Sequence, residues 1–94
     1  MKKSDIIDII FENNSEYYKQ DVESIVNQVF DVIKMGLDTD GKVMISNFGT
    51  FEKIVQEDYL GTNPYTGERQ MFKGGNRIHF TSSKNLKDII NKKN

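Results

Sequence analysis

Two lysines near the end of the chain have the residue type and spacing for contact with phosphate. Lys84 and Lys87 lie three residues apart at the start of a predicted final helix, so they share one face of it. Two cations at a helix N-terminus oppose the helix dipole, which slightly disfavours folding. That local cost favours a role in anion binding, while a purely solvated charged face remains the alternative.

Catalytic chemistry finds little support in the residue types. The one histidine, His79, stands between Ile78 and Phe80 in a predicted strand, with no ligand partner two or four residues away. The chain has no cysteine, hence no disulfide framework and no thiolate metal site. Gly74-Gly75 is too short to cradle a phosphate. We therefore expect no enzyme, no cofactor, no metal and no small-molecule substrate.

The distribution of charge is more informative than the net charge of −1. Residues 1–40 carry four lysines and nine acidic residues, a net of −5. Residues 41–80 carry five basic and four acidic residues, and residues 81–94 carry four lysines and one aspartate. The near-neutral total argues against a nucleic-acid partner, whereas the basic C-terminal end favours one. Scatter of charge over a solvated surface is the alternative.

The size of the chain bounds its organisation. Its 94 residues are expected to form one domain, residues 1–94, whose 36% hydrophobic content is enough for a small core. A chain this short buries only about 60–65% of its surface alone, so a partner subunit often supplies the rest of the core. No apolar run approaches the roughly 20 residues of a membrane span, and no membrane partner is expected.

Helical spacing of apolar residues dominates the first 40 residues. A first helix follows Ser4-Asp5 and ends near Asn13-Asn14-Ser15. A second, strongly amphipathic helix is apolar at Val22, Ile25, Val26, Val29, Phe30, Ile33 and Leu37. This apolar face is wider than one short helix would cover, and a second subunit is one way to cover it.

The remaining residues change to a strand pattern. Short strands at Val43–Ile45 and Thr50–Val55 precede a returning strand that reaches Phe80 and is interrupted by Gly74-Gly75. Between them, few residues suit a core, and a projecting two-stranded arm over about 55–77 would explain this. A sheet with its arm is thus expected over 41–81, followed by a helix over 82–94 with Ser82 as its N-cap.

Three strings of residues resemble the HU / integration host factor family of bacterial histone-like DNA-binding proteins. They are Val43-Met44-Ile45-Ser46-Asn47-Phe48-Gly49-Thr50-Phe51, Gly61-Thr62-Asn63-Pro64-Tyr65-Thr66-Gly67 and Phe80-Thr81-Ser82-Ser83-Lys84-Asn85-Leu86-Lys87. The resemblance covers essentially the whole chain and implies an α+β fold. In that fold two N-terminal helices, a three-stranded antiparallel sheet with a protruding β-ribbon arm, and a short C-terminal helix build an intertwined dimer. The implied dimer core is Val29, Phe30, Phe48, Phe51 and Phe80.

The resemblance also implies the residues that contact DNA. Pro64 matches the family proline that wedges between base pairs from the minor groove, with a simple turn-shaping role as the alternative. Lys3, Lys84 and Lys87 match basic family positions that face the DNA backbone. The predicted contacts also include Lys53, Asn63 and, on the returning side of the arm, Arg69, Lys73 and Arg77. Where family arms carry arginines, this chain has Gln56, Tyr59 and Thr62, with Glu57-Asp58 between them. The arm is therefore neutral, and DNA binding should be weaker than in a typical relative.

Together these observations predict a non-enzymatic, nucleoid-associated protein of the bacterial cytoplasm. It would bind and bend double-stranded DNA through the minor groove with low sequence specificity, as a homodimer or as a heterodimer with a paralogue. The alternative is an interaction module of the same fold with weakened DNA binding, paired with a more basic paralogue.

Overall fold

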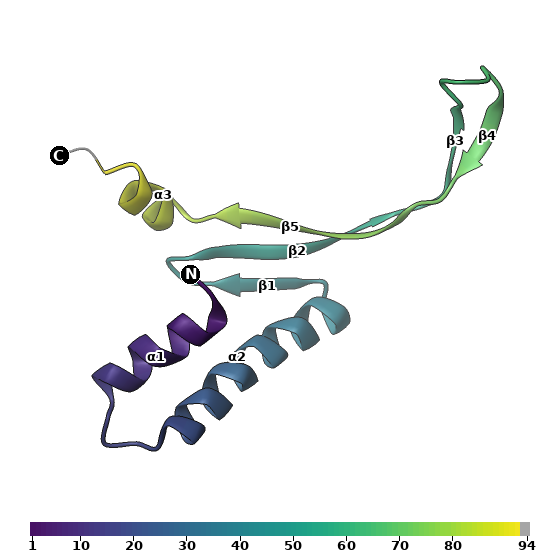
Figure 1. Cartoon of the computed structure of the whole chain (residues 1–94). Helices are drawn as coiled ribbons and strands as arrows, with labels where there is room; N and C mark the ends of the chain where they lie inside the picture. Colours follow the sequence, from purple (N-terminus) through teal and green to yellow (C-terminus); the bar gives the residue numbers. More distant parts are fainter. Residues whose placement is uncertain (93–94) are drawn as a thin grey trace. The chain divides into compact units, whose positions relative to one another are not determined.

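The computed structural model describes residues 1–92, which form three helices and five strands (Figure 1). Their bounds are α1 (Lys3–Asn13), α2 (Lys19–Thr39), β1 (Lys42–Ile45), β2 (Gly49–Gln56), β3 (Tyr59–Thr62), β4 (Arg69–Phe72), β5 (Gly75–Ser82) and α3 (Lys84–Ile90). The chain divides within α2 into two compact units, Met1–Met35 and the part from Gly36 onward. The α+β class expected from the sequence is confirmed.

The first unit is a helix pair with a small apolar core. Among residues 1–92, the buried hydrophobic side chains are Ile7 on α1 and Val22 and Val26 on α2. The Asp5 carboxylate accepts a hydrogen bond from the Lys2 backbone N–H at 2.6 Å, which caps α1 near its predicted start. Between the two helices the Lys19 ammonium lies 2.8 Å from the Asp8 carboxylate, and this contact raises the pKa of Lys19.

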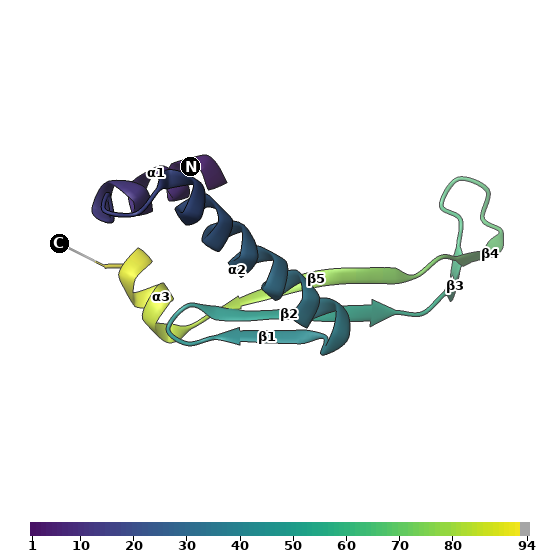
Figure 2. The same cartoon turned by 90° about the horizontal axis from the view of Figure 1, so that it is seen from below.

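The second unit contains a three-stranded antiparallel sheet in the order β1-β2-β5 (Figure 2). Its register pairs Val43 with Phe51 and Phe51 with Phe80, so these three side chains form one row across the sheet. Because side chains alternate between faces along a strand, the register separates two faces. The apolar sheet face carries Val43, Phe51, Lys53, Val55, Ile78 and Phe80, and the polar sheet face carries Lys42, Met44, Thr50, Glu52, Ile54, Arg77, His79 and Thr81.

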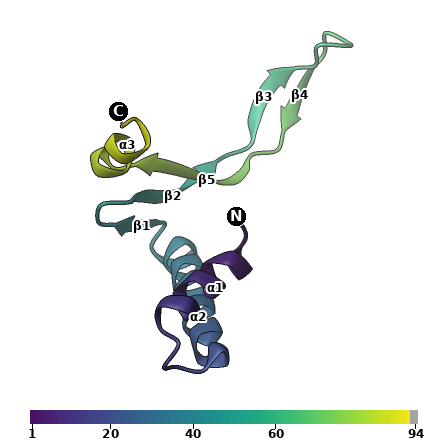
Figure 3. The same ribbon diagram turned by 60° about the vertical axis from the view of Figure 1, so that its left-hand side comes forward.

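The arm predicted from the sequence is a separate two-stranded sheet of β3 and β4. It projects from the ends of β2 and β5, and α3 follows the opposite end of β5 (Figure 3). Residues 57–58 and 73–74 interrupt the ladder between sheet and arm. The predicted three-stranded sheet with a protruding ribbon is confirmed.

The final helix is shorter than predicted and begins at Lys84, two residues after the predicted start at residue 82. Ser83, not Ser82, is its N-cap, and the Ser83 hydroxyl accepts a hydrogen bond from the Leu86 N–H at 3.0 Å. The prediction of Ser82 was wrong because Ser82 is the last residue of β5, paired with Gly49. The helix ends at Ile90, so Asn91, its C-cap, and Lys92 lie outside it, contrary to the predicted span. The last two residues of that span, Lys93 and Asn94, lie outside the described residues.

Within residues 1–92, no helix is both long and apolar enough to cross a membrane. The expectation of a single domain over residues 1–94 stays a prediction.

Candidate nucleic-acid interface

The tip of the arm is a turn held together by Asn63. The side-chain oxygen of Asn63 accepts hydrogen bonds from the backbone N–H groups of Tyr65 (2.9 Å) and Thr66 (3.4 Å). Its backbone carbonyl accepts from the Gly67 N–H at 2.8 Å, and its own N–H donates to the Glu68 carbonyl at 2.7 Å. These bonds fix the backbone around the exposed ring of Pro64.

Residue types at the tip suit this turn. Asn and Asp side chains commonly bond the backbone two residues ahead, as Asn63 does here. Gly67 closes the turn with φ of +74°, a conformation that residues with a Cβ adopt at a cost. Pro64 has its φ fixed by its ring and needs no N–H at this position. The tip therefore presents Pro64 on a backbone with little freedom.

The arm has two different faces. Its register pairs Tyr59 with Phe72 and Leu60 with Met71. We call the side with Leu60, Thr62, Arg69 and Met71 the Arg69 face, and the side with Tyr59, Gly61, Gln70 and Phe72 the Tyr59 face. The Tyr59 and Phe72 rings are stacked, with centroids 5.5 Å apart. The predicted contact Arg69 thus shares its face with apolar side chains and not with the aromatic stack.

At the junction of arm and sheet, Asp58, one of the acidic residues that make the arm neutral, has a structural role. The Asp58 carboxylate accepts a hydrogen bond from the Gly74 backbone N–H at 2.8 Å. A Cβ on Gly74 would overlap the carbonyl oxygen of Gln56 and the backbone of Glu57, so the two strands approach too closely here for any other residue. Sequence reasoning missed this role of Asp58, because nothing in the pattern showed that residues 58 and 74 face each other.

Gly74→Ala should therefore loosen the arm at its base. We expect the change to cost about 1–3 kcal/mol of local stability, as overpacking does elsewhere. Hydrogen exchange of the β3 and β4 amides measures this directly. Gly75→Ala is the matched control, since a Cβ there meets nothing within 4 Å, and it should leave exchange unchanged. Equal exchange in the two variants would contradict the close approach at Gly74.

Arg77 and Lys53, both predicted DNA contacts, lie on opposite faces of the sheet. Arg77 is exposed on the polar sheet face, with Lys42, Glu52 and His79. Lys53 is half-buried on the apolar sheet face, and its ammonium donates to the Asp38 carbonyl at 3.1 Å. Asp38 is in the last turn of α2, where carbonyl groups lack helical partners. The structure thus gives Lys53 a role in closing the helix end and does not bring it together with Arg77.

The other predicted basic contacts are exposed. Lys73 lies at the junction of arm and sheet, Lys84 and Lys87 are on α3, and Lys3 is at the start of α1 in the first unit. Lys87 falls in the last turn of the seven-residue α3, where a cation is favourable. The predicted cost of opposing the helix dipole was therefore wrong for Lys87 and applies to Lys84 alone.

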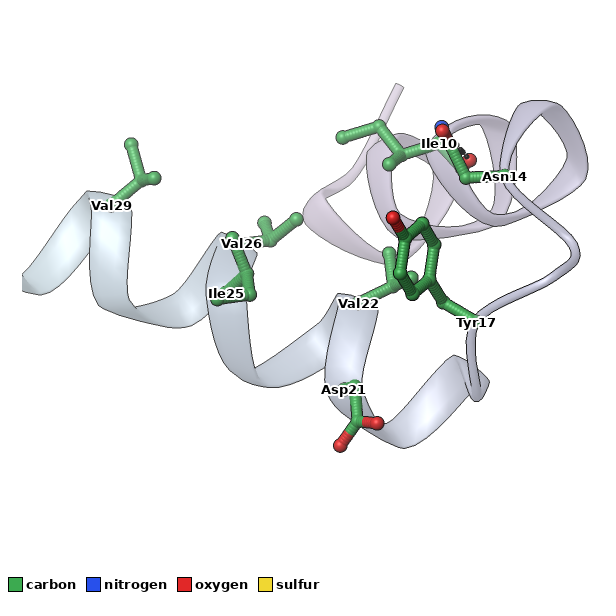
Figure 4. A pocket seen from close by; sticks show the side chains of 8 residues that line it. All are labelled: Ile10, Asn14, Tyr17, Asp21, Val22, Ile25, Val26 and Val29. Atoms are coloured by element: carbon green, nitrogen blue, oxygen red, sulfur yellow. Dashed lines mark hydrogen bonds between the residues drawn. The ribbon is translucent and has the colours of Figure 1, made fainter.

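Four of the five residues predicted for a dimer core are exposed in the described chain, and the fifth, Phe51, is half-buried. Phe48, Phe51 and Phe80 form an aromatic cluster whose centroids are 4.7–6.4 Å apart. Phe48 and Phe80 are nevertheless 43% and 38% exposed, and Val29 and Phe30 on α2 are also exposed. In the first unit, side chains of α1, α2 and the turn between them line an open apolar hollow of about 380 Å³ (Figure 4). Large apolar surface therefore remains open in both units.

Metal-binding geometry does not occur in the part of the chain that the structure describes. No group of three or more His, Cys, Asp or Glu side chains in residues 1–92 could hold a metal ion.

Comparison with known proteins assigns the chain to a family. The family described as "Bacterial DNA-binding protein" matches residues 1–91. The chain belongs to this family. The resemblance to HU and integration host factor seen in the sequence is thereby confirmed, as is the prediction of a DNA-binding protein, while the interaction-module alternative is not favoured.

Two relatives in this bacterial DNA-binding family share 35% of their residues with the chain over 91 positions. They are the integration host factor subunit alpha of Anaeromyxobacter sp. (strain Fw109-5) and DNA-binding protein HU-1 of Halalkalibacterium halodurans. The aligned region covers 97% of this chain and 91% and 100% of those proteins, respectively. The integration host factor subunit beta of Histophilus somni is 28% identical over 97% of both chains.

The fold of this chain is also found in a solved structure. A cocrystal structure of Anabaena HU with DNA superposes with a TM-score of 0.77, covering 99% of this chain and 100% of that one. The sequence identity is 22%, so this likeness supports the HU-like fold.

Proposed function

We propose that this chain is an architectural protein that binds and bends double-stranded DNA through the minor groove with low sequence specificity. It acts without catalysis, as a dimer, in the nucleoid of a bacterial cytoplasm. The observation that carries the proposal is the projecting arm with Pro64 fixed at its tip, in a chain that belongs to a DNA-binding family.

The apolar surface left open by the single chain supports the dimer. Only three hydrophobic side chains are buried among residues 1–92, far fewer than a stable domain of this size requires. A second copy packed on the Phe48–Phe51–Phe80 cluster and on the exposed side of α2 would supply the missing core. Two of the similar proteins are named as the alpha and beta subunits of integration host factor. The partner in the proposed dimer is therefore either a second copy of this chain or a paralogous chain.

The arm tip supports bending through the minor groove. An apolar wedge that enters between two base pairs unstacks one step at a cost of a few kcal/mol, and the bent duplex then touches more protein (IHF and HU are examples of this principle). Pro64 suits this task because its ring is exposed and its backbone is held by the Asn63 hydrogen bonds. Outside the arm, phosphates are contacted by Lys3 in the first unit and, in the second unit, by Arg77, Lys84 and Lys87.

Electrostatic attraction is the weaker part of this interface. Between Leu60 and Phe72 the only charged residues are Glu68 and Arg69, which cancel. Neutralised phosphates supply essentially all non-specific affinity, and each contributes about 0.9 to the slope of log K against log salt. A neutral arm therefore gives weaker binding with a shallow salt slope. A titration of a random-sequence duplex at several salt concentrations tests the proposed function, and no binding even at low salt would refute it.

Thr62→Arg should restore part of the missing attraction. Thr62 lies opposite Arg69 on the Arg69 face, so a new guanidinium there extends the basic surface of the arm. We expect tighter binding and a salt slope steeper by about 0.9 for each phosphate gained. Gln70→Arg is the matched control, because it adds the same charge on the Tyr59 face. Tyr59 itself is unsuitable for this test because substitution would break its stack on Phe72. If both variants steepen the slope equally, the Arg69 face is not the one along DNA.

A further inference from the structure

The most exposed aromatic ring of the described chain follows Pro64 directly. The side chain of Tyr65 is 94% exposed, against 81% for Tyr18 and 49% for Tyr59. The ring pairs within residues 1–92 join Phe48, Phe51 and Phe80, or Tyr59 and Phe72, so the Tyr65 ring stacks on nothing. The turn does not need this ring, because the contact that holds Tyr65 is made by its backbone N–H.

The position of Tyr65 is fixed although its ring is free. Its N–H donates to Asn63 Oδ1 at 2.9 Å, and the Gly67 N–H bonds back to the Asn63 carbonyl at 2.8 Å. Pro64 and Tyr65 therefore stand side by side at the apex of one hydrogen-bonded turn. A ring carried on such a turn loses less conformational freedom on binding than one on a flexible loop.

The chemistry of the tip points to a stacking contact. Tyr65 at the tip and Leu60 and Met71 nearer the base of the arm are all exposed, while Glu68 and Arg69 cancel, so the arm offers apolar and aromatic surface and almost no net charge. Nucleobases are the aromatic surfaces of DNA, and every base has a π-face on which a tyrosine ring can stack. In an intact duplex those faces are covered by neighbouring base pairs, and opening one step costs free energy.

We propose that Tyr65 is a binding site for an unstacked nucleobase: when Pro64 opens a base step, the Tyr65 ring stacks on the base face that is freed. This inference rests on the proposed DNA binding and adds a second contact at the same step. A base that is already unstacked, as beside a one-nucleotide gap, saves the cost of opening. Tyr65 therefore makes the protein favour gapped over intact duplexes more strongly than Pro64 alone would.

The test compares affinities for a gapped and an intact duplex of the same sequence, at one salt concentration. We expect Tyr65→Ala to weaken binding to the gapped duplex by roughly tenfold, within the range measured for base–aromatic stacking, and to reduce the gapped-to-intact ratio. Tyr65→Phe keeps the ring and should preserve the ratio. Tyr18→Ala is the matched control, since it removes an exposed tyrosine from the turn between α1 and α2.

A second readout locates the contact. With 5-iododeoxyuridine beside the gap, irradiation should cross-link the base to Tyr65, and fragmentation of the tryptic peptide separates Tyr65 from Tyr59. The proposal requires both the cross-link at Tyr65 and the loss of preference in Tyr65→Ala, and absence of either overturns it. Binding and bending of the intact duplex by the unchanged protein test the proposed function separately. If those persist while Tyr65→Ala behaves like Tyr18→Ala, only the stacking inference fails.

Discussion

Phe51→Ala should destabilise the folded protein by about 3–5 kcal/mol, the usual cost of removing a buried phenylalanine ring. The Phe51 ring centroid lies 4.7 Å from that of Phe80 and 6.4 Å from that of Phe48, so it joins the other two rings. In the proposed dimer the partner covers this cluster. The substitution should then lower both the free energy of unfolding and the stability of the dimer. Because unfolding of a dimer includes dissociation of its subunits, the measured stability depends on protein concentration.

Denaturant unfolding at two protein concentrations, together with sedimentation equilibrium, measures this effect. At micromolar concentration the unchanged protein should have about twice the 10.9 kDa chain mass. Met44→Ala is the control, because Met44 is a large exposed side chain on the polar sheet face. A well-folded monomer, or equal effects of Phe51→Ala and Met44→Ala, would argue against the dimer core.

Pro64→Ala should reduce DNA bending more than it reduces affinity. In the proposed complex the proline ring acts on geometry by holding one base step open, whereas the lysines proposed as phosphate contacts are unchanged in this variant. Alanine also frees the backbone φ at the tip. Energy transfer between dyes on the two DNA ends should report a clearly smaller bend in saturated complexes of this variant.

Lys84→Ala combined with Lys87→Ala should give the reverse pattern. Removal of two phosphate contacts weakens binding almost uniformly across sequences, while the remaining complexes stay bent. If Pro64→Ala bends DNA as fully as the unchanged protein does, Pro64 is only a turn residue and the wedge is refuted.

Local patterns in the sequence were sufficient to predict most of the fold. The helical spacing from Val22 to Leu37 located α2, and the change of period at Lys42 located the sheet. Both could be predicted because apolar residues recur about every 3.6 residues in an amphipathic helix and every second residue in a strand. The N-cap of α3 was misplaced by one residue because two adjacent serines are equivalent by type. Only pairing of Ser82 with Gly49 in the sheet decides between them.

Contacts between residues that are distant in the chain could not be predicted from the sequence. Asp58 looked like a charge that weakens DNA binding, and its bond to the Gly74 N–H shows a structural use instead. Lys53 looked like a phosphate contact, yet its ammonium bonds the Asp38 carbonyl 15 residues earlier in the chain. Both side chains are held by backbone groups, and residue type alone carries no signal for such partners.

The interruption of the ladder between sheet and arm has a thermodynamic consequence. The arm forms a four-pair hairpin of its own, and an isolated two-stranded hairpin is at best marginally stable in water. Apart from the Asp58–Gly74 bond, its order depends on few contacts with the sheet, so it belongs to the low-stability end of the molecule. The tip turn keeps its own hydrogen bonds, so the motion that DNA binding would restrict is that of the hairpin as a unit about its base. Favourable contacts must offset this loss of entropy, and association should then have a more favourable enthalpy and a less favourable entropy than with an arm joined rigidly to the sheet.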